Sequence, residues 1–322
     1  MYSLKEKFKK AIVTGGAGFV GSNLVEALLE DGLEVVSIDD YSAGKQRNLE
    51  PLIRQYPDRF QAVNCDITDK SDLKRYFEGV DIVFHQAASK MTVCLLDPMR
   101  DLAVNAGGTF NLLELARDYG VRKFIHVSTG SVYGKARYFP TDENHPLNPT
   151  SYYGVSKLAG EKYARAFSDL YDMDVSMLRY YHVYGPKQDA GQYGGVIGIF
   201  CEKTLRNEDI TIYGDGTQIR SFTYVRDVVN INKFVALYGE KGEAYNCASG
   251  LKVSINEIAT KIIDLAKSTS KVHYADWKTG DIKDFDVSHA KLEALGFKFE
   301  YLDFDKGLEA TFNWYKKAMQ DV

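Results

Sequence analysis

The sequence has few cysteines and no long apolar run, and both absences exclude classes of protein. Its four cysteines, Cys65, Cys94, Cys201 and Cys247, form no C-x-x-C pair, so neither a disulfide framework nor a zinc site is predicted. No segment approaches the roughly 20 consecutive apolar residues that cross a bilayer, and the charged start MYSLKEKFKK does not suit a signal peptide. We expect a soluble, cytoplasmic protein with no membrane partner and no bound metal.

Positive charge is not in excess either. The chain has 40 Lys and Arg against 44 Asp and Glu, a balance that gives no electrostatic footprint for nucleic acid. A hydrophobic share of 45% and a charged share of 26% are ordinary globular values. With 322 residues the chain is long enough for about two domains.

Glycines at a regular spacing follow the first apolar run. Residues 11–13 suit a buried strand, and Gly15, Gly18 and Gly21 then repeat as G-x-x-G-x-x-G before a helix expected over residues 18–31. Such a turn brings backbone and the positive end of a helix dipole to a pyrophosphate. A second apolar run, 34–38, ends in Asp39, near the offset at which an acid binds the adenosine ribose. The combination favours a dinucleotide site over a strand–turn–helix without a ligand.

Strand-like and helix-like segments alternate as far as residue 179. The expected strands include 61–63, 82–84, 123–127 and 175–178, and the expected helices include 101–119 and 153–171. This alternation predicts an α/β fold, a Rossmann-type doubly wound parallel sheet. We expect residues 1–179 to form the nucleotide domain, a later segment of about 218–240 to return to it, and residues 180–322 to form a smaller C-terminal α/β lobe that binds the substrate.

A hydroxyl residue and a Tyr/Lys pair stand where chemistry is expected. Thr129 ends a predicted strand, and Tyr153 and Lys157 form a Y-x-x-x-K pair on one helical face. A nearby cation lowers a tyrosine pKa toward the range of an acid or base. With 22 tyrosines such pairs also arise by chance. His85 has no metal-ligand partner at a usable spacing, and we interpret it as structural.

Several motifs in order carry a resemblance to a known family. They are TGGAGFVGS at Thr14, DDYSAG at Asp39, HQAA at His85, Asn105 with Gly108-Thr109, STGSVYG at Ser128, YGVSK at Tyr153, RYYHVYGP at Arg179, IYGDGTQIRSFTYV at Ile212 and YNCASG at Tyr245. With these motifs the chain resembles the extended short-chain dehydrogenase/reductases, and within them the nucleotide-sugar 4-epimerases. The resemblance covers nearly the whole chain.

The resemblance implies an NAD cofactor and a set of residues that bind it. Gly15, Gly18, Phe19 and Val20 would hold the pyrophosphate, Asp39, Ser42 and Gly44 the adenosine ribose, Asp66 and Ile67 the adenine, and Lys90 the phosphates. Further cofactor residues would be Ala87, Ala88, Asn105, Tyr153, Lys157 and Tyr180. On local grounds Asp66 is equally a helix N-cap. Asp39-Asp40 favours NAD over NADP, although Lys45 and Arg47 lie nearby.

The resemblance also implies a catalytic set and a substrate site. Tyr153 would be the acid/base, Lys157 would hold the nicotinamide ribose and tune Tyr153, and Thr129 would polarise the same sugar hydroxyl. The residues expected to bind a nucleotide-diphosphate sugar are Lys90, Thr129, Tyr153, His182, Val196, Tyr213, Arg220 and Lys278. The family forms homodimers through two helices, here near 101–119 and 153–171.

The residues after Thr129 discriminate between reactions. Related 4,6-dehydratases carry an Asp-Glu pair there, and decarboxylases usually a glutamate, whereas this chain has Gly130 and Ser131. The remaining prediction is NAD-dependent inversion of C4, through a transient 4-keto sugar, on UDP-glucose/UDP-galactose or their N-acetylated analogues. The alternatives are a 4-keto-sugar reductase using NAD or NADP and, least favoured, a non-catalytic dinucleotide sensor.

Four departures from the family pattern leave the substrate open. His182 stands in place of a common Asn, Gly198 in place of Pro, Ser221 in place of Asp, and Lys278 in place of Arg. The loop 281–286 also looks shortened.

Overall fold

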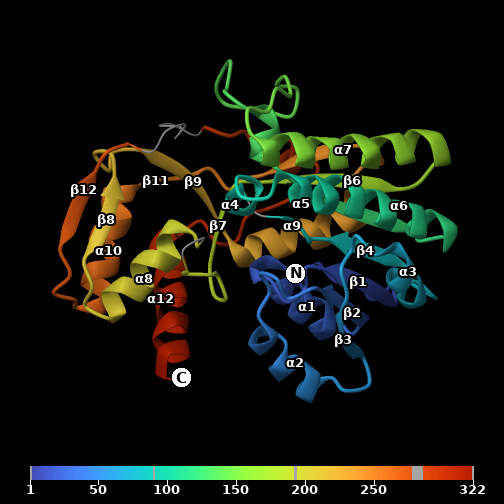
Figure 1. Ribbon diagram of the computed structural model, residues 1–322, viewed down its shortest axis with the longest axis horizontal. Helices are drawn as coiled ribbons and strands as arrows, with labels where there is room; N and C mark the ends of the chain where they lie inside the picture. The colour runs from blue at the N-terminus through green and yellow to red at the C-terminus, as the bar shows by residue number, and fades with distance from the viewer. Residues whose placement is uncertain (1, 90, 192–193, 278–285, 321–322) are drawn as a thin grey trace.

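A seven-stranded parallel sheet forms the larger part of the molecule (Figure 1). The computed structural model describes residues 2–89, 91–191, 194–277 and 286–320. The strand order is β10-β6-β5-β4-β1-β2-β3. The strands are β1 (Lys10–Thr14), β2 (Glu34–Asp39), β3 (Phe60–Asn64), β4 (Ile82–His85), β5 (Lys123–Thr129), β6 (Val175–Tyr180) and β10 (Ala244–Cys247). The predicted doubly wound α/β fold is confirmed.

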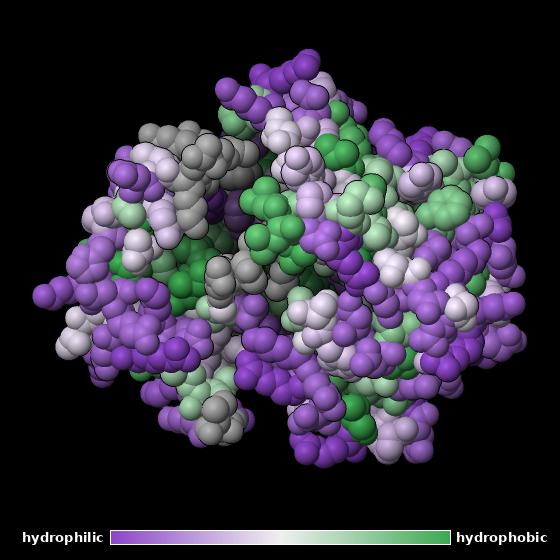
Figure 2. All heavy atoms as spheres, in the orientation of Figure 1, coloured by the Kyte–Doolittle hydropathy of each residue, from purple (hydrophilic) through white to green (hydrophobic). Residues whose placement is uncertain are grey.

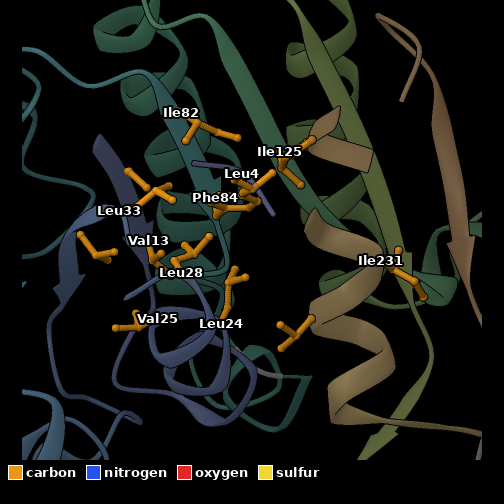
Figure 3. Packing of buried hydrophobic residues seen from close by; sticks show 14 of the residues in the cluster. Leu4, Val13, Leu24, Val25, Leu28, Leu33, Ile82, Phe84, Ile125 and Ile231 are labelled. Atoms are coloured by element: carbon orange, nitrogen blue, oxygen red, sulfur yellow. The ribbon is translucent and has the colours of Figure 1, made fainter. Parts of the chain in front are cut away.

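Helices cover both faces of this sheet because its strands are apolar on both sides. Phe84 packs with Leu24 and Leu28 of α1 and Val229 of α9 on one face (Figure 3), and its neighbour Val83 packs against α6 and α7 on the other. The helices of this domain are α1 (Phe19–Glu30), α2 (Glu50–Gln55), α3 (Lys70–Leu73), α4 (Met91–Cys94), α5 (Pro98–Leu102), α6 (Thr109–Asp118), α7 (Tyr152–Tyr171) and α9 (Val225–Tyr238). Between α5 and α6 the expected helix 101–119 contains a π-helical turn, Ala103–Gly108.

The C-terminal lobe has its own core and two small sheets. One sheet has the order β11-β9-β7 and the other pairs β12 with β8. Its elements are β7 (His182–Tyr184), α8 (Val196–Leu205), β8 (Ile210–Tyr213), β9 (Ile219–Tyr224), β11 (Leu251–Ser254), α10 (Ile255–Ala266), β12 (Val272–Ala275), α11 (Ala290–Ala294) and α12 (Phe304–Gln320). Aromatic side chains such as Phe222, Phe304 and Phe312 fill the core between these elements, although α11 places Leu292 in the core of the larger domain.

The chain passes between the two parts more than once. Within the segment predicted to return to the main sheet, only α9 does so, as a covering helix, because β9 pairs with β7 and β11 instead. The strand that joins the main sheet is β10, beyond the predicted segment, which pairs in parallel with β6. The boundary at residue 179 stays a prediction.

Two features bear on the expectations from composition. Within the described ranges no helix is long and apolar enough to cross a membrane. All four cysteines are buried, and none of them takes part in a disulfide.

Candidate active site

The first glycine turn opens the cleft at the carboxyl end of β1. Gly15 has a φ of +66°, and a Cβ there would lie 2.7 Å from the backbone nitrogen of Ala87, so only glycine suits the position. A Cβ on Gly21 would lie 2.1 Å from the Gly15 carbonyl oxygen, which explains the close packing of α1 on the turn. Gly18 is the N-cap of α1. The free N–H groups of that helix start are therefore available to a phosphate.

Asp39, the last residue of β2, lies buried at the next strand end. Its carboxylate accepts hydrogen bonds from the backbone N–H groups of Ala17 and Tyr41, both at 2.9 Å. Burial raises the pKa of Asp39, and these two hydrogen bonds oppose that effect. A carboxylate has about four acceptor positions, so it retains capacity for the hydroxyl groups of a ribose.

Arg100 on α5 is a cleft residue that sequence reasoning missed. Its guanidinium bridges Asp40 at 3.0 Å and Asp66 at 2.8 Å, and thereby ties α5 to the ends of β2 and β3. Burial raises the pKa of the Asp66 carboxyl, but hydrogen bonds from Thr68 and Arg100 outweigh that effect, so its pKa is lowered overall. The N-cap of α3 is Asp69, so the alternative of Asp66 as that cap is wrong. No local sequence pattern around Arg100 predicts these contacts, because Asp66 and Asp40 precede it by 34 and 60 positions in the chain.

These elements enclose a cleft of about 390 Å³. The predicted cofactor residues that line it are Gly15, Gly18, Phe19, Val20, Asp39, Ser42, Gly44, Asp66, Ile67, Ala87, Ala88, Tyr153 and Tyr180. Lys45, Arg100, Lys187 and Asp189 line it as well. Lys45 and Asp189 form an ion pair at 2.8 Å that joins the two lobes beside the cleft.

Two predicted cofactor residues do not line the cleft, and a third lies outside the described residues. Asn105 is buried in the π-helical turn, where its amide bonds the Ser89 backbone N–H at 2.9 Å and the side chains of Asp101 and Ser156 at 3.0 Å. Lys157 lies buried behind the cleft wall. Lys90 is not among the described residues. Asn105 therefore shapes the cleft from behind, through the loop at Ser89 and helix α7.

The three predicted catalytic residues converge at the end of β5 and the start of α7. Ser151 caps α7 by accepting the Gly154 N–H at 3.1 Å, and a Cβ on Gly154 would lie 2.8 Å from the Ser131 carbonyl oxygen. This close packing sets the first turn of α7 against the turn after Thr129. Thr129 donates a hydrogen bond to the Ser131 hydroxyl at 3.3 Å, and Tyr153 lines the cleft beside it.

Burial controls the protonation of Tyr153 and Lys157. It raises the pKa of Tyr153 to about 12, against a hydrogen bond with Thr129 that lowers it. It lowers the pKa of Lys157 to about 8, and the Lys157 Nζ has no hydrogen-bond partner within the part of the chain described. The expected lowering of the Tyr153 pKa by Lys157 is therefore not found in the protein without a ligand, because loss of hydration raises that pKa and the hydrogen bond with Thr129 only partly opposes it.

Buried histidines lie beneath Lys157. His85 bonds the hydroxyls of Thr14 and Thr109, both at 2.8 Å, in agreement with a structural role. Burial holds the pKa of His85 and of His126 well below the usual range, so both rings are neutral. No group of three or more possible metal ligands occurs among the described side chains.

The predicted substrate residues of the second lobe do not line the cofactor cleft. His182 in β7 and Arg220 in β9 face one another closely enough for the Arg220 charge, after burial, to lower the pKa of His182, which falls to about 4. Val196 begins α8, and Tyr213 ends β8 with 42% of its surface exposed. Lys278 and most of the loop 281–286 lie outside the described residues.

The fold and this cleft define a dinucleotide-dependent enzyme of the short-chain dehydrogenase/reductase type. The model of the NAD dependent epimerase/dehydratase family matches residues 11–248. The chain is 38% identical over 308 residues to a putative UDP-glucose 4-epimerase of Methanocaldococcus jannaschii, covering 95% of this chain and 98% of the relative. It is 36% identical to the UDP-glucose 4-epimerase of Mycolicibacterium smegmatis, covering 97% and 100%. The chain belongs to this family.

Solved structures agree with the assignment. A UDP-glucose 4-epimerase of Thermotoga maritima with UDP-glucose superposes with a TM-score of 0.90 at 33% identity, over 96% of this chain and 99% of that one. The Thermus thermophilus UDP-glucose 4-epimerase in complex with NAD gives 0.87 at 34% identity, over 96% and 99%. The expectations of an isomerase and of NAD as cofactor are confirmed. The glycine turn, Asp39 and the Lys157 ammonium, which has no hydrogen-bond partner among the described side chains, fit that cofactor.

The family is broader than one reaction. Similar proteins include a dTDP-D-glucose 4,6-dehydratase of Mus musculus at 33% identity and a UDP-N-acetyl-alpha-D-glucosaminuronate decarboxylase of Bacillus cytotoxicus at 32%. A UDP-N-acetylglucosamine 4-epimerase from Methanobrevibacter ruminantium superposes with a TM-score of 0.90 at 32% identity, over 97% of this chain and all of that one. The substrate of this isomerase, and the carbon that it inverts, must therefore be argued from its own residues.

Proposed function

We propose that the protein inverts C4 of a UDP-sugar, with UDP-glucose/UDP-galactose or their N-acetylated analogues as substrates. The observation that carries the proposal is the arrangement of Thr129, Tyr153 and Lys157 at one end of the NAD cleft, with Gly130 and Ser131 next to Thr129. It provides an acid/base, and the two residues after Thr129 carry no carboxylate.

The roles of the chain's own residues follow from their positions. NAD, when bound, would supply the hydride acceptor and donor that inversion at C4 needs, and its positive charge would favour ionisation of Tyr153. Tyr153 takes the proton of the 4-hydroxyl and later returns it. Thr129 hydrogen-bonds the same sugar oxygen, and Lys157 binds the nicotinamide ribose. Burial keeps the pKa of His85 and His126 low, so these two histidines add no positive charge next to Lys157 near neutral pH.

Water loss or decarboxylation does not suit this arrangement. Elimination across C5 and C6 of a sugar needs an additional acid and base, and the two residues after Thr129 carry neither. Asp101 is the acidic group whose charge bears on Tyr153, and it is buried with its oxygen bonded by Asn105 at 3.0 Å.

The direct test is turnover without added cofactor. Purified protein is incubated separately with UDP-glucose, UDP-galactose and the two N-acetylated analogues, and products are resolved by ion-pair chromatography. We expect the C4 epimer from at least one pair, approached from both directions. Absence of any C4 epimer from all four sugars would refute the proposal.

Cofactor retention separates epimerisation from net reduction. An epimerase regenerates NAD in every cycle and gains by keeping it, whereas a 4-keto-sugar reductase must exchange it. We expect mass spectrometry of the denatured protein to release close to one NAD per chain. A largely empty protein that consumes NADH or NADPH with a 4-keto sugar would favour the reductase. Unchanged behaviour of Tyr153→Phe in every assay would favour the sensor.

We further propose a homodimer through α7 and through the stretch from α5 to the end of α6, near residues 101–119. Met99 is 72% exposed, Val155 53% and Leu102 46%, and Figure 2 shows apolar side chains over α4 and beside α7. Apolar patches of this kind mark interaction sites. Light scattering should give twice the mass of one chain. Val155→Asp should lower the measured mass to that of a single chain. Leu302→Asp, at an exposed position of the other lobe, should leave the measured mass unchanged. A monomeric unsubstituted protein would refute the dimer.

A further inference from the structure

Gly130 is enclosed by an aromatic ring from the neighbouring strand end. A Cβ built on Gly130 would lie 2.5 Å from Cε1, 2.8 Å from Cζ and 2.9 Å from Cδ1 of Tyr181. Ordinary carbon contacts begin near 3.5 Å, so the ring of Tyr181 already occupies the space that a side chain at position 130 would take. Position 130 therefore lacks a carboxylate in the sequence and also lacks the space for one, because the ring of Tyr181 fills it.

The topology explains why these two residues meet. Thr129 and Tyr180 are register partners in the β5–β6 pairing, and Gly130 and Tyr181 are the next residues of each chain segment beyond the ladder. They leave the sheet at its carboxyl edge, where ligands of open α/β sheets bind. The ring of Tyr181 thus lies against Gly130, the residue that directly follows Thr129.

The hydroxyl of Tyr181 makes no hydrogen bond to the described residues that would explain why a tyrosine occupies this position. Its oxygen is buried and has no hydrogen-bond partner within the described part of the chain, although a buried unpaired hydroxyl costs free energy. The residue as a whole is only partly buried. A phenylalanine would fill the same volume without that cost.

We propose that Tyr181 is a specificity-determining residue paired with Gly130. Its ring forms the wall beside Thr129, excludes any side chain at position 130, and retains the oxidised sugar until it is reduced again. The inference rests on the proposed epimerase function and deepens it, because it names the side chain that confines the reaction to inversion.

The test is a double-mutant cycle on the full enzyme with its retained NAD. The variants are Gly130→Ala, Tyr181→Ala, the double variant and Tyr181→Phe, with Gly107→Ala as the control glycine, since a Cβ there meets nothing within 4 Å. For each we measure kcat and KM for the epimer pair, the melting temperature, retained NAD, and the near-ultraviolet absorbance of reduced nicotinamide during turnover.

We expect Gly130→Ala to reduce kcat about tenfold or more in the unsubstituted background and less than about threefold when Tyr181 is already alanine, because the clash is gone; such non-additivity measures direct contact. Tyr181→Ala should let oxidised sugar escape, so reduced cofactor accumulates. Tyr181→Phe and Gly107→Ala should keep kcat within about threefold.

Additive effects of the two alanines, or a Tyr181→Phe as impaired as Tyr181→Ala, would overturn the pairing. If the two alanine substitutions are non-additive in melting temperature alone, with kcat and the amount of reduced cofactor unchanged, the contact is structural and the specificity role is overturned. Failure of the proposed function looks different, because the unsubstituted enzyme would then form no C4 epimer at all.

Discussion

Replacing Lys157 with methionine should stabilise the NAD-free protein while destroying its activity. Lys157 is 1% exposed and its ammonium has no hydrogen-bond partner among the described residues. Burial lowers its pKa from 10.5 to about 8, a difference of about 2.5, which corresponds to roughly 3 kcal/mol. Methionine keeps the length of the side chain and removes the buried charge, so the free energy of unfolding at pH 7 should rise by up to about 3 kcal/mol.

The pH dependence follows from the direction of that shift. The folded pKa lies below the unfolded one, so the destabilising effect of Lys157 is complete below pH 8 and disappears as the pH rises from 8 to 10.5. The difference in the free energy of unfolding between Lys157→Met and the unsubstituted protein should therefore be largest near neutral pH and disappear by about pH 10. Urea unfolding of NAD-stripped protein at several pH values measures it.

Lys123 provides a matched control. It is equally buried, but its ammonium donates to Asp174 at 2.6 Å, Ser176 at 3.0 Å and the Gly239 carbonyl at 3.1 Å. Burial also lowers the pKa of Lys123, but Lys123→Met leaves Asp174, Ser176 and the Gly239 carbonyl without their donor and should therefore destabilise by about 1–3 kcal/mol. If Lys157→Met is as destabilising as Lys123→Met at pH 7, or if its effect does not change with pH, the reasoning from burial is wrong.

Three other predictions concern the reaction, the cofactor and the fold. Tyr153→Phe should lower kcat by about 10²–10⁴ with NAD still bound, and loss of NAD in the purified variant would show that the hydroxyl acts in binding instead. Arg100→Ala should weaken NAD binding about fivefold, after allowance for a partly exposed site, as measured by titration of stripped protein, and unchanged affinity would mean that the bridge does not order the adenosine end. Glu161→Ala breaks a buried ion pair with Arg179 and should cost about 3–5 kcal/mol, whereas Glu202→Ala, in an exposed pair, should cost under about 1 kcal/mol; equal losses in urea unfolding would contradict the burial argument.

The cofactor end of the site was predictable because its signals are local. A glycine that must adopt positive φ, a buried strand and an acid at the next strand end lie in contiguous stretches, and their roles depend on backbone geometry. Gly15 and Asp39 lie where the sequence predicts, and so does Tyr153, because a parallel sheet brings its carboxyl ends to one edge.

The parts that were missed depend on contacts between distant segments. Arg100 reaches Asp40 and Asp66 only because α5 folds over β2 and β3. The glycine at position 198 is explained by Tyr315 of the last helix, whose hydroxyl would lie 2.4 Å from a Cβ there. No pattern within a window of ten residues carries either contact.

The sequence alone determined the family and the cofactor and predicted the acid/base residues, because these follow from short motifs whose chemistry is set by residue type and spacing. Only the tertiary structure decided their electrostatics and surroundings. Burial, a property of the whole fold, raises the pKa of Tyr153 and leaves the Lys157 ammonium without a hydrogen-bond partner among the residues that the structure describes. The meeting of Gly130 with Tyr181 depends on the register of two strands about 50 residues apart, and that register exists only once the sheet has formed.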